Sequence, residues 1–173
     1  YKEKEIVEAY KVSGFTDPMF STFAQSMQSF HFYDNQVELL GEQFVNPIAF
    51  GGINRYLFVL EDTTINGRDT TFTIFFRPRK GKDFDGLSGR LFINTNGYAI
   101  EKVMAAPYKP SSTGMFINVV QEYAFIDGEK WFPMKLSTEV QMVFPAITVS
   151  KGKTAFVSGK GATYMETVQF NPP

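Results

Sequence analysis

The chain has 173 residues and no cysteine, and its 17 basic and 18 acidic side chains give a formal net charge of −1. This length can bury one substantial core, whereas two separate halves would each be marginal. The balanced charge supplies no overall field that would select nucleic acid or an anionic membrane, and the lack of cysteine excludes thiol nucleophiles, disulfides and cysteine-ligated zinc.

The N-terminal part predicts helices. Residues 1–12 place Ile6, Val7 and Tyr10 on one side of a helix and Lys and Glu on the other. Asp17 followed by Pro18 is a typical helix start, and apolar residues follow at helical spacing to about residue 28. This second apolar stripe contains Met19, Phe20, Phe23, Ala24 and Met27.

Residues 29–54 carry a weaker pattern, which suggests a short helix or strand before a loop at Pro47 and Gly51-Gly52. From residue 55 the pattern becomes that of strands. Phe72, Ile74 and Phe76 alternate with more polar residues, as on a strand with one buried face. Tight turns are expected at residues 66–67, 96–97 and 127–128, where Asn-Gly and Asp-Gly pairs occur.

The longest alternation covers residues 132–144, and two shorter strands are expected at 154–158 and 162–170. One face of the long strand would carry Phe132, Met134, Leu136, Val140, Met142 and Phe144. The fold class predicted from these patterns is α+β. We expect a strongly curved antiparallel half-barrel of about eight strands, with one or two N-terminal helices packed on its concave face.

We expect residues 1–173 to form a single domain, with a helical and irregular part at 1–54 and an antiparallel meander at 55–170. Because the chain begins at Tyr1 and shows no signal peptide, we expect it to be a processed protein or a piece of a longer one. It has no apolar run long enough to cross a bilayer as a helix.

Phenylalanine and methionine give the main candidate site, since flexible methionine adapts to irregular apolar ligands. An apolar ligand between helix and sheet would contact Phe20, Phe23, Met27, Phe72, Phe76, Phe132, Met134, Met142 and Phe144. The alternative is that these side chains form a filled core.

A basic run supplies a second candidate, a contact for an anion or a lipid headgroup through Arg77, Arg79, Lys80 and Lys82. Its alternative is a solvated turn neutralised by Asp83 and Asp85. His31 is the single histidine, and no nucleophile motif accompanies it, so a packed side chain is favoured over a catalytic base. No cofactor and no metal site is predicted.

Three segments resemble a family of outer-membrane-associated proteins of Gram-negative bacteria. They are YLFVLEDT at 56–63, PRKGKDFDGL at 78–87 and INTNGYAI at 93–100. In that family a carboxypeptidase-regulatory-like domain precedes this region and a membrane β-barrel follows it. A weaker likeness, through the turn at Asn96-Gly97 and the later Trp131-Phe132-Pro133, is to the lipoprotein-carrier half-barrel.

The resemblance implies a periplasmic location, tethered to or part of an outer-membrane protein, with flanking domains of the parent protein as neighbours. The function expected is non-enzymatic binding of a lipid, an acyl chain or a partner's apolar segment in the sheet concavity. The alternatives are a structural or interaction module with a solid core and, least favoured, a hydrolase. Nucleic acid is not expected as a partner.

Overall fold

The computed structural model describes residues 6–9, 11, 13, 32–109, 114–150 and 153–170, with the side chains of 143–150 and 153–157 left aside. Strands make up nearly all of the regular secondary structure of these residues, which also contain one short helix. The elements are β1 (Gln36–Leu39), β2 (Glu42–Val45), α2 (Gly52–Arg55), β3 (Tyr56–Asn66), β4 (Asp69–Pro78), β5 (Leu87–Asn94), β6 (Ala99–Pro107), β7 (Met115–Ile126), β8 (Lys130–Ser150) and β9 (Lys153–Tyr164).

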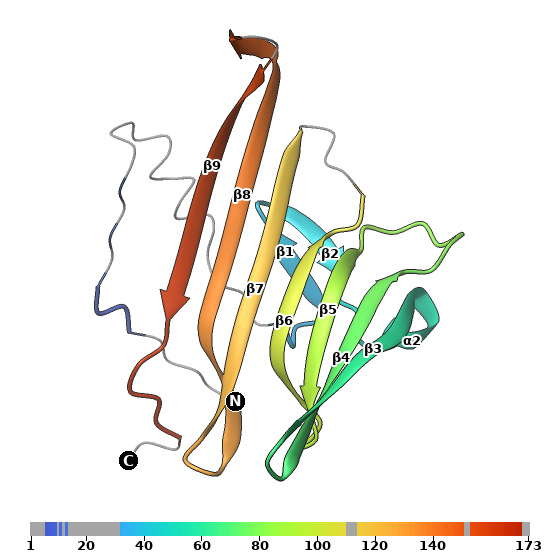
Figure 1. Cartoon of the computed structure of the whole chain (residues 1–173), viewed down its shortest axis with the longest axis vertical. Helices are drawn as coiled ribbons and strands as arrows, with labels where there is room; N and C mark the ends of the chain where they lie inside the picture. Colours follow the sequence, from blue (N-terminus) through green and yellow to red (C-terminus); the bar gives the residue numbers. More distant parts are fainter. Residues whose placement is uncertain are drawn as a thin grey trace.

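Strands β3 to β9 form one seven-stranded antiparallel sheet in sequence order, and the sheet is open, with β3 and β9 at its edges (Figure 1). The predicted antiparallel sheet is therefore confirmed. Its turns also fall where glycine permits a positive φ, as at Gly67 and Gly97, where φ is 63° and 75°. Strands β6 and β7 pair over a short stretch, in which Lys102–Ala105 of β6 lies opposite Val119–Glu122 of β7. Strands β7–β9 extend well beyond the ends of the other strands.

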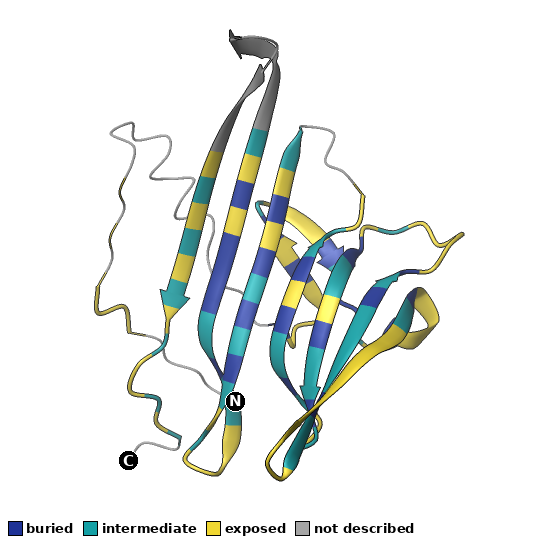
Figure 2. Ribbon diagram, viewed as in Figure 1, coloured by how far each residue is buried: buried dark blue, intermediate teal, exposed yellow. Residues whose placement is uncertain are grey.

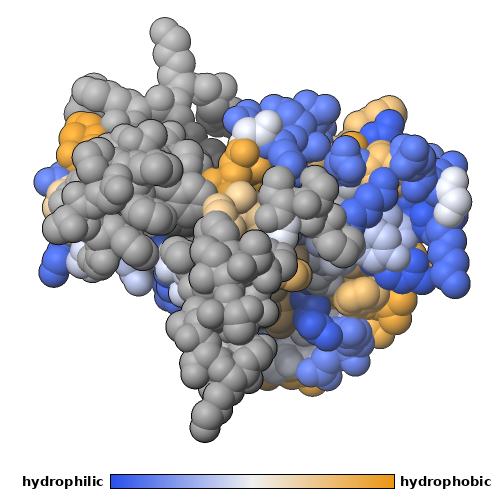
Figure 3. Space-filling model, turned by 90° about the horizontal axis from the view of Figure 1, so that it is seen from above, coloured by the Kyte–Doolittle hydropathy of each residue, from blue (hydrophilic) through white to orange (hydrophobic). Residues whose placement is uncertain are grey.

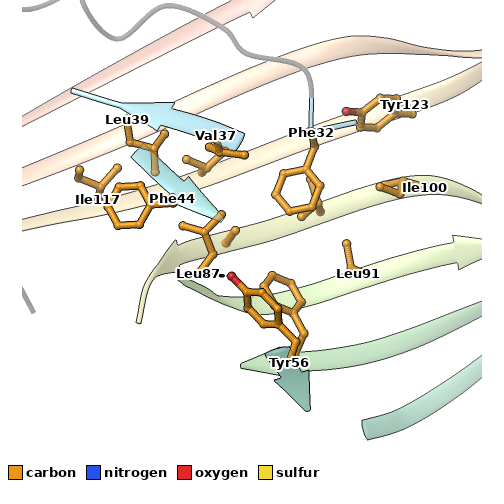
Figure 4. Close-up of a cluster of buried hydrophobic side chains, with 14 of the residues drawn as sticks. Phe32, Val37, Leu39, Phe44, Tyr56, Leu87, Leu91, Ile100, Ile117 and Tyr123 are labelled. Carbon is orange, nitrogen blue, oxygen red and sulfur yellow. Dashed lines mark hydrogen bonds between the residues drawn. The ribbon is translucent and has the colours of Figure 1, made fainter. Parts of the chain in front are cut away.

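Strands β1 and β2 form a separate hairpin that lies against one face of this sheet, which we call the hairpin face. The buried residues of the hairpin are Val37, Leu39 and Phe44, and their side chains lie between the hairpin and the sheet (Figure 4). Phe32, just before the hairpin, is also completely buried. From the sheet, the core receives Tyr56, Phe76, Leu87, Leu91, Ile100, Val103, Ala105, Ile117, Val119, Tyr123 and Val140.

Burial is uneven across the sheet (Figure 2). Strands β4 to β8 carry buried residues among half-buried and exposed ones, whereas edge strand β3 is exposed along most of its length. The face opposite the hairpin carries ion pairs. Glu122 lies 3.1 Å from Lys102 and 3.7 Å from Lys135, and Arg90 binds Glu61 at 2.7 Å.

The predicted α+β class is wrong for the described chain. What covers the sheet among the described residues is a β-hairpin, and the main sheet has seven strands where about eight were expected. Residues 6–9, within the helix predicted at 1–12, have no regular secondary structure. An isolated helix of that length is marginal in water unless it packs on something, so its amphipathic pattern is not sufficient. The helix predicted at 17–28 lies outside the described residues.

A β-bulge overturns the single register predicted for residues 132–144. Along β7 and β8 the pairing passes from Glu122–Lys135 directly to Tyr123–Pro133, which leaves Met134 as an extra residue in β8. Tyr123 belongs to the core, so its neighbour Ala124 and the paired Phe132 lie on the opposite face. Phe132 therefore does not share a face with Met142.

We predict that Phe44→Ala lowers the free energy of unfolding by about 3–5 kcal/mol, since the ring is 5% exposed and its removal leaves a cavity between hairpin and sheet. Urea denaturation followed by circular dichroism measures the change. Phe116→Ala is the matched control, because that ring is 52% exposed. Equal losses in the two variants would show that the hairpin does not contribute to the core.

Candidate ligand-binding site

Part of the predicted apolar site lies on the hairpin face, and the middle of this face is filled. Phe76 is completely buried, with its ring centroid 6.5 Å from that of Phe32 and 6.1 Å from that of Tyr56. Phe72 is half-buried four residues earlier on the same strand and is paired with Ile93. These two predicted ligand contacts lie on one strand, but Phe76 contacts protein rings and has no surface left for a ligand.

Beyond this packed middle, the hairpin face continues along β7 and β8. Ile117 and Val140 are paired and buried. Two residues further along each strand, Met115 and Met142 are paired and only half-buried. Of the residues predicted on β8, Met142 thus lies on the hairpin face. Met134 is half-buried at the bulge.

Phe132 lies on the other face, where its ring packs edge-on against Phe170 at 6.1 Å. The remaining predicted contacts fall outside what the structure describes. These are Phe20, Phe23 and Met27 and the side chain of Phe144. His31, which was expected to be a packed side chain, also lies outside the described residues.

The predicted basic run forms the end of β4 and the turn that follows it. Arg77 is half-buried and donates to the carbonyl of Pro78 at 3.0 Å, whereas Arg79, Lys80 and Lys82 are exposed. Arg79 donates to the Ile53 carbonyl at 3.3 Å, so the turn lies next to α2. Asp83, expected to neutralise the run, is instead bound to Lys109 at 3.0 Å.

Between the basic turn and the core, the phenol of Tyr56 joins three strands. Its hydroxyl donates to the carbonyl of Val45 in β2 and accepts the N–H of Leu87 in β5 at 3.1 Å (Figure 4). Tyr56 itself begins β3, and its side chain is completely buried. The hydroxyl therefore fixes the hairpin to the sheet at a point where neither backbone group has solvent to bind.

The side chain of Asn46 holds together the chain segments before and after the hairpin. It is fully buried, and its amide nitrogen donates to the carbonyls of Phe32 at 2.6 Å and Asp34 at 2.8 Å. Its side-chain oxygen accepts the N–H of Ile48 at 3.0 Å. The segment before β1 is also held by Tyr33, whose hydroxyl accepts the N–H of Ile100 at 2.9 Å.

Burial changes the titration of both core tyrosines. Desolvation raises the pKa of Tyr56 to about 12, although the hydrogen bond from Leu87 acts in the opposite direction. Desolvation likewise raises the pKa of Tyr123 above its ordinary value, and Tyr123 donates to Gln121 Oε1 at 2.8 Å. Both phenols are thus neutral hydrogen-bonding groups of the core at physiological pH.

The described surface includes two depressions. One of about 330 Å³ lies beside the hairpin and α2 and is lined by Asn35, Gln36, Val45, Ala49, Phe50 and Arg55. The other, about 130 Å³, lies on the opposite face of the sheet between β7, β8 and β9 and is lined mostly by polar residues. In the described ranges, no three His, Asp or Glu side chains come together as a metal site would need.

Sequence reasoning missed the roles of Tyr56 and Asn46, and for the hairpin region it suggested only a short helix or strand. The signal for β1 was present as the alternation of Gln36, Val37, Glu38 and Leu39, but the turn signal was not. Leu40 and Gly41 form a two-residue loop with φ values of 52° and 82°, and leucine is a poor indicator of such a turn.

Comparisons with known proteins give one match. Residues 1–159 match the model of a family described as a family of unknown function, DUF5686. Neither a curated protein nor a solved structure matches the chain. Among the described residues, no helix has the length and apolar character of a membrane span.

We predict that Tyr56→Phe lowers the free energy of unfolding at neutral pH by about 1–3 kcal/mol, because the buried Leu87 N–H and Val45 carbonyl lose their partner. In the native protein, the raised pKa of Tyr56 stabilises the fold fully below pH 10, and this contribution is lost as the pH rises towards 12. The variant should therefore show a shallower alkaline decline, with Tyr123 responsible for the part that remains.

Urea denaturation of both proteins at a series of pH values measures these effects. Tyr98→Phe is the control, since that side chain is 74% exposed and should change neither quantity. A variant as stable as the native protein, with the same alkaline decline, would contradict the role given to the Tyr56 hydroxyl.

Proposed function

The chain belongs to DUF5686, a family of unknown function, and from this premise we propose that it is a non-enzymatic periplasmic module of an outer-membrane-associated protein. In this proposal the hairpin face of its sheet binds a lipid, an acyl chain or an apolar segment of a partner. The location rests on the resemblance of residues 56–63, 78–87 and 93–100.

One observation carries the binding proposal. Met115 and Met142 are neighbours on the hairpin face, and both are half-buried where the fully buried part of the core ends. Methionine side chains are flexible and polarisable, so they adapt to an irregular apolar ligand better than branched residues do. The same face already holds apolar side chains of the hairpin, so the added ligand would extend an existing apolar layer.

A structural module with a solid core is the second candidate, and the packing of the hairpin favours it. Phe44, Val37 and Phe76 leave no room in the middle of the face. In this candidate the partly buried methionines are simply the rim of the core. A hydrolase is the least favoured function, and it would require turnover that disappears in His31→Ala.

A titration with a fluorescent fatty acid separates the first two candidates. We expect saturable binding to the native chain and a loss of at least about tenfold in affinity for Met142→Asp, because a charge would then face the apolar ligand. Phe116→Asp is the matched control, since Phe116 follows Met115 directly and lies on the opposite face.

Binding that survives Met142→Asp but is lost in Phe116→Asp would place the ligand on the wrong face and refute the proposal. Negligible fluorescence change in all three proteins would support the solid module. Circular dichroism of each variant shows whether a loss of binding reflects a loss of fold.

A further inference from the structure

The connection between β2 and β3 holds two large apolar side chains out in solvent. Phe50 is 99% exposed and Ile53 is 71% exposed, although they are only three residues apart. Exposed apolar residues scattered singly are ordinary, but a fully exposed phenylalanine beside an exposed isoleucine forms a local apolar tip.

This tip is presented by a constrained backbone. The N–H of Ala49 donates to the Asn46 carbonyl at 3.2 Å, and the N–H of Gly52 donates to the Ala49 carbonyl at 2.8 Å. Gly52 lies so close to Pro47 that a Cβ atom would sit 2.0 Å from the Pro47 carbonyl oxygen. The loop is thus anchored to buried Asn46 at its base, and Phe50 projects from it.

Cationic side chains lie next to the tip. The N–H of Arg79 donates to the Arg55 carbonyl at 2.8 Å and its guanidinium donates to the Ile53 carbonyl, which brings the turn 79–82 against α2. The turn carries Lys80 and Lys82, both exposed. Figure 3 shows hydrophobic and strongly hydrophilic surface side by side on the side of the molecule where α2, β3 and β4 lie in Figure 1.

We propose that the loop 46–51, α2 and the turn 79–82 form a membrane-docking surface that binds a bilayer containing anionic lipids. Phe50 and Ile53 insert between the headgroups, and Arg55, Arg79, Lys80 and Lys82 bind lipid phosphates. The proposal concerns a different surface from the methionine site and does not depend on it.

The geometry fits a bilayer better than a protein groove. A side chain that is 99% exposed projects beyond its neighbours, as an inserting residue must, whereas a protein interface needs a broad complementary area. The cations lie beside the apolar tip, where they would meet headgroup phosphates when the tip enters the interface. The depression of about 330 Å³ beside Phe50 and Arg55 offers space for one such headgroup.

Vesicle flotation tests the surface. The probe is a set of vesicles of equimolar phosphatidylglycerol and phosphatidylcholine, and vesicles of phosphatidylcholine alone serve as the uncharged comparison. We expect the native chain to float with the anionic vesicles, less so at high salt. Binding should fall at least about tenfold in Phe50→Ser with Ile53→Ser, and by a similar factor in Lys80→Glu with Lys82→Glu.

The matched control is Ile65→Ser with Arg68→Glu. Ile65 is 76% exposed, and both residues lie at the other end of the β3–β4 hairpin, so the control removes a similarly exposed isoleucine from β3 and a cation from the turn that joins β3 to β4. It should bind as the native chain does. Inorganic phosphate added as a competitor should not displace the protein, because it cannot replace the apolar contacts.

Four results would overturn the proposal. The native chain could fail to float with anionic vesicles, which would leave the tip to a protein partner. The control could lose binding as completely as the Phe50 and Ile53 variant. The variant Phe50→Ser with Ile53→Ser could bind as the native chain does, or inorganic phosphate could displace the native chain from the vesicles. Either result would show that the surface is a simple anion site. A blue shift of fluorescence in Phe50→Trp on adding anionic vesicles, corrected for native Trp131, checks insertion directly.

Discussion

The structure depends on one buried hydroxyl. The phenol of Tyr56 satisfies a carbonyl of β2 and an N–H of β5 while its own backbone begins β3, so three strands are joined at one oxygen. Burying a phenol is unfavourable unless both of its hydrogen-bonding functions are used, and here they are. The surroundings are shaped to it as well, since a Cβ atom on Gly86 would lie 2.9 Å from this oxygen. Only a glycine leaves the hydroxyl free to reach both partners.

The sequence was informative about the sheet and uninformative about its cover. Alternation in β4 and the Asn-Gly pairs indicated strands and turns correctly, because both signals are local. Which element covers a buried face depends on contacts between residues far apart in the sequence, and local patterns do not show such contacts. The apolar stripe of 17–28 made a helix the obvious candidate, yet Phe32, Val37 and Phe44 fill the middle of the face. Their hairpin was hidden because Leu40 takes a positive φ that leucine rarely adopts.

The candidate site shows a second limit of the same kind. In residues 132–144 the even-numbered positions follow a single alternating pattern, so the sequence predicts that Phe132 and Met142 lie on the same face of the strand. Pairing with β7 shows that Met134 is a bulge, and one extra residue sends every side chain beyond it to the other face. Proline cannot donate to the ladder and occurs inside a central strand mainly at bulges, so Pro133 was the available signal for the bulge at Met134. The strand itself was thus predicted well, but the face on which each side chain lies was predicted correctly only as far as the bulge.

Because the hairpin fills the middle of its face, the two proposed binding surfaces lie at the margins of this face, and the margins differ in chemistry. At the β7–β8 margin two neutral methionines lie side by side, which suits an uncharged apolar guest. At the β3 margin an apolar tip stands beside cations, which suits a charged interface. Strands β4 to β6 and the hairpin separate the two margins. Loss of one surface should therefore leave the other intact, and a module that used both would hold an apolar ligand while resting against a membrane.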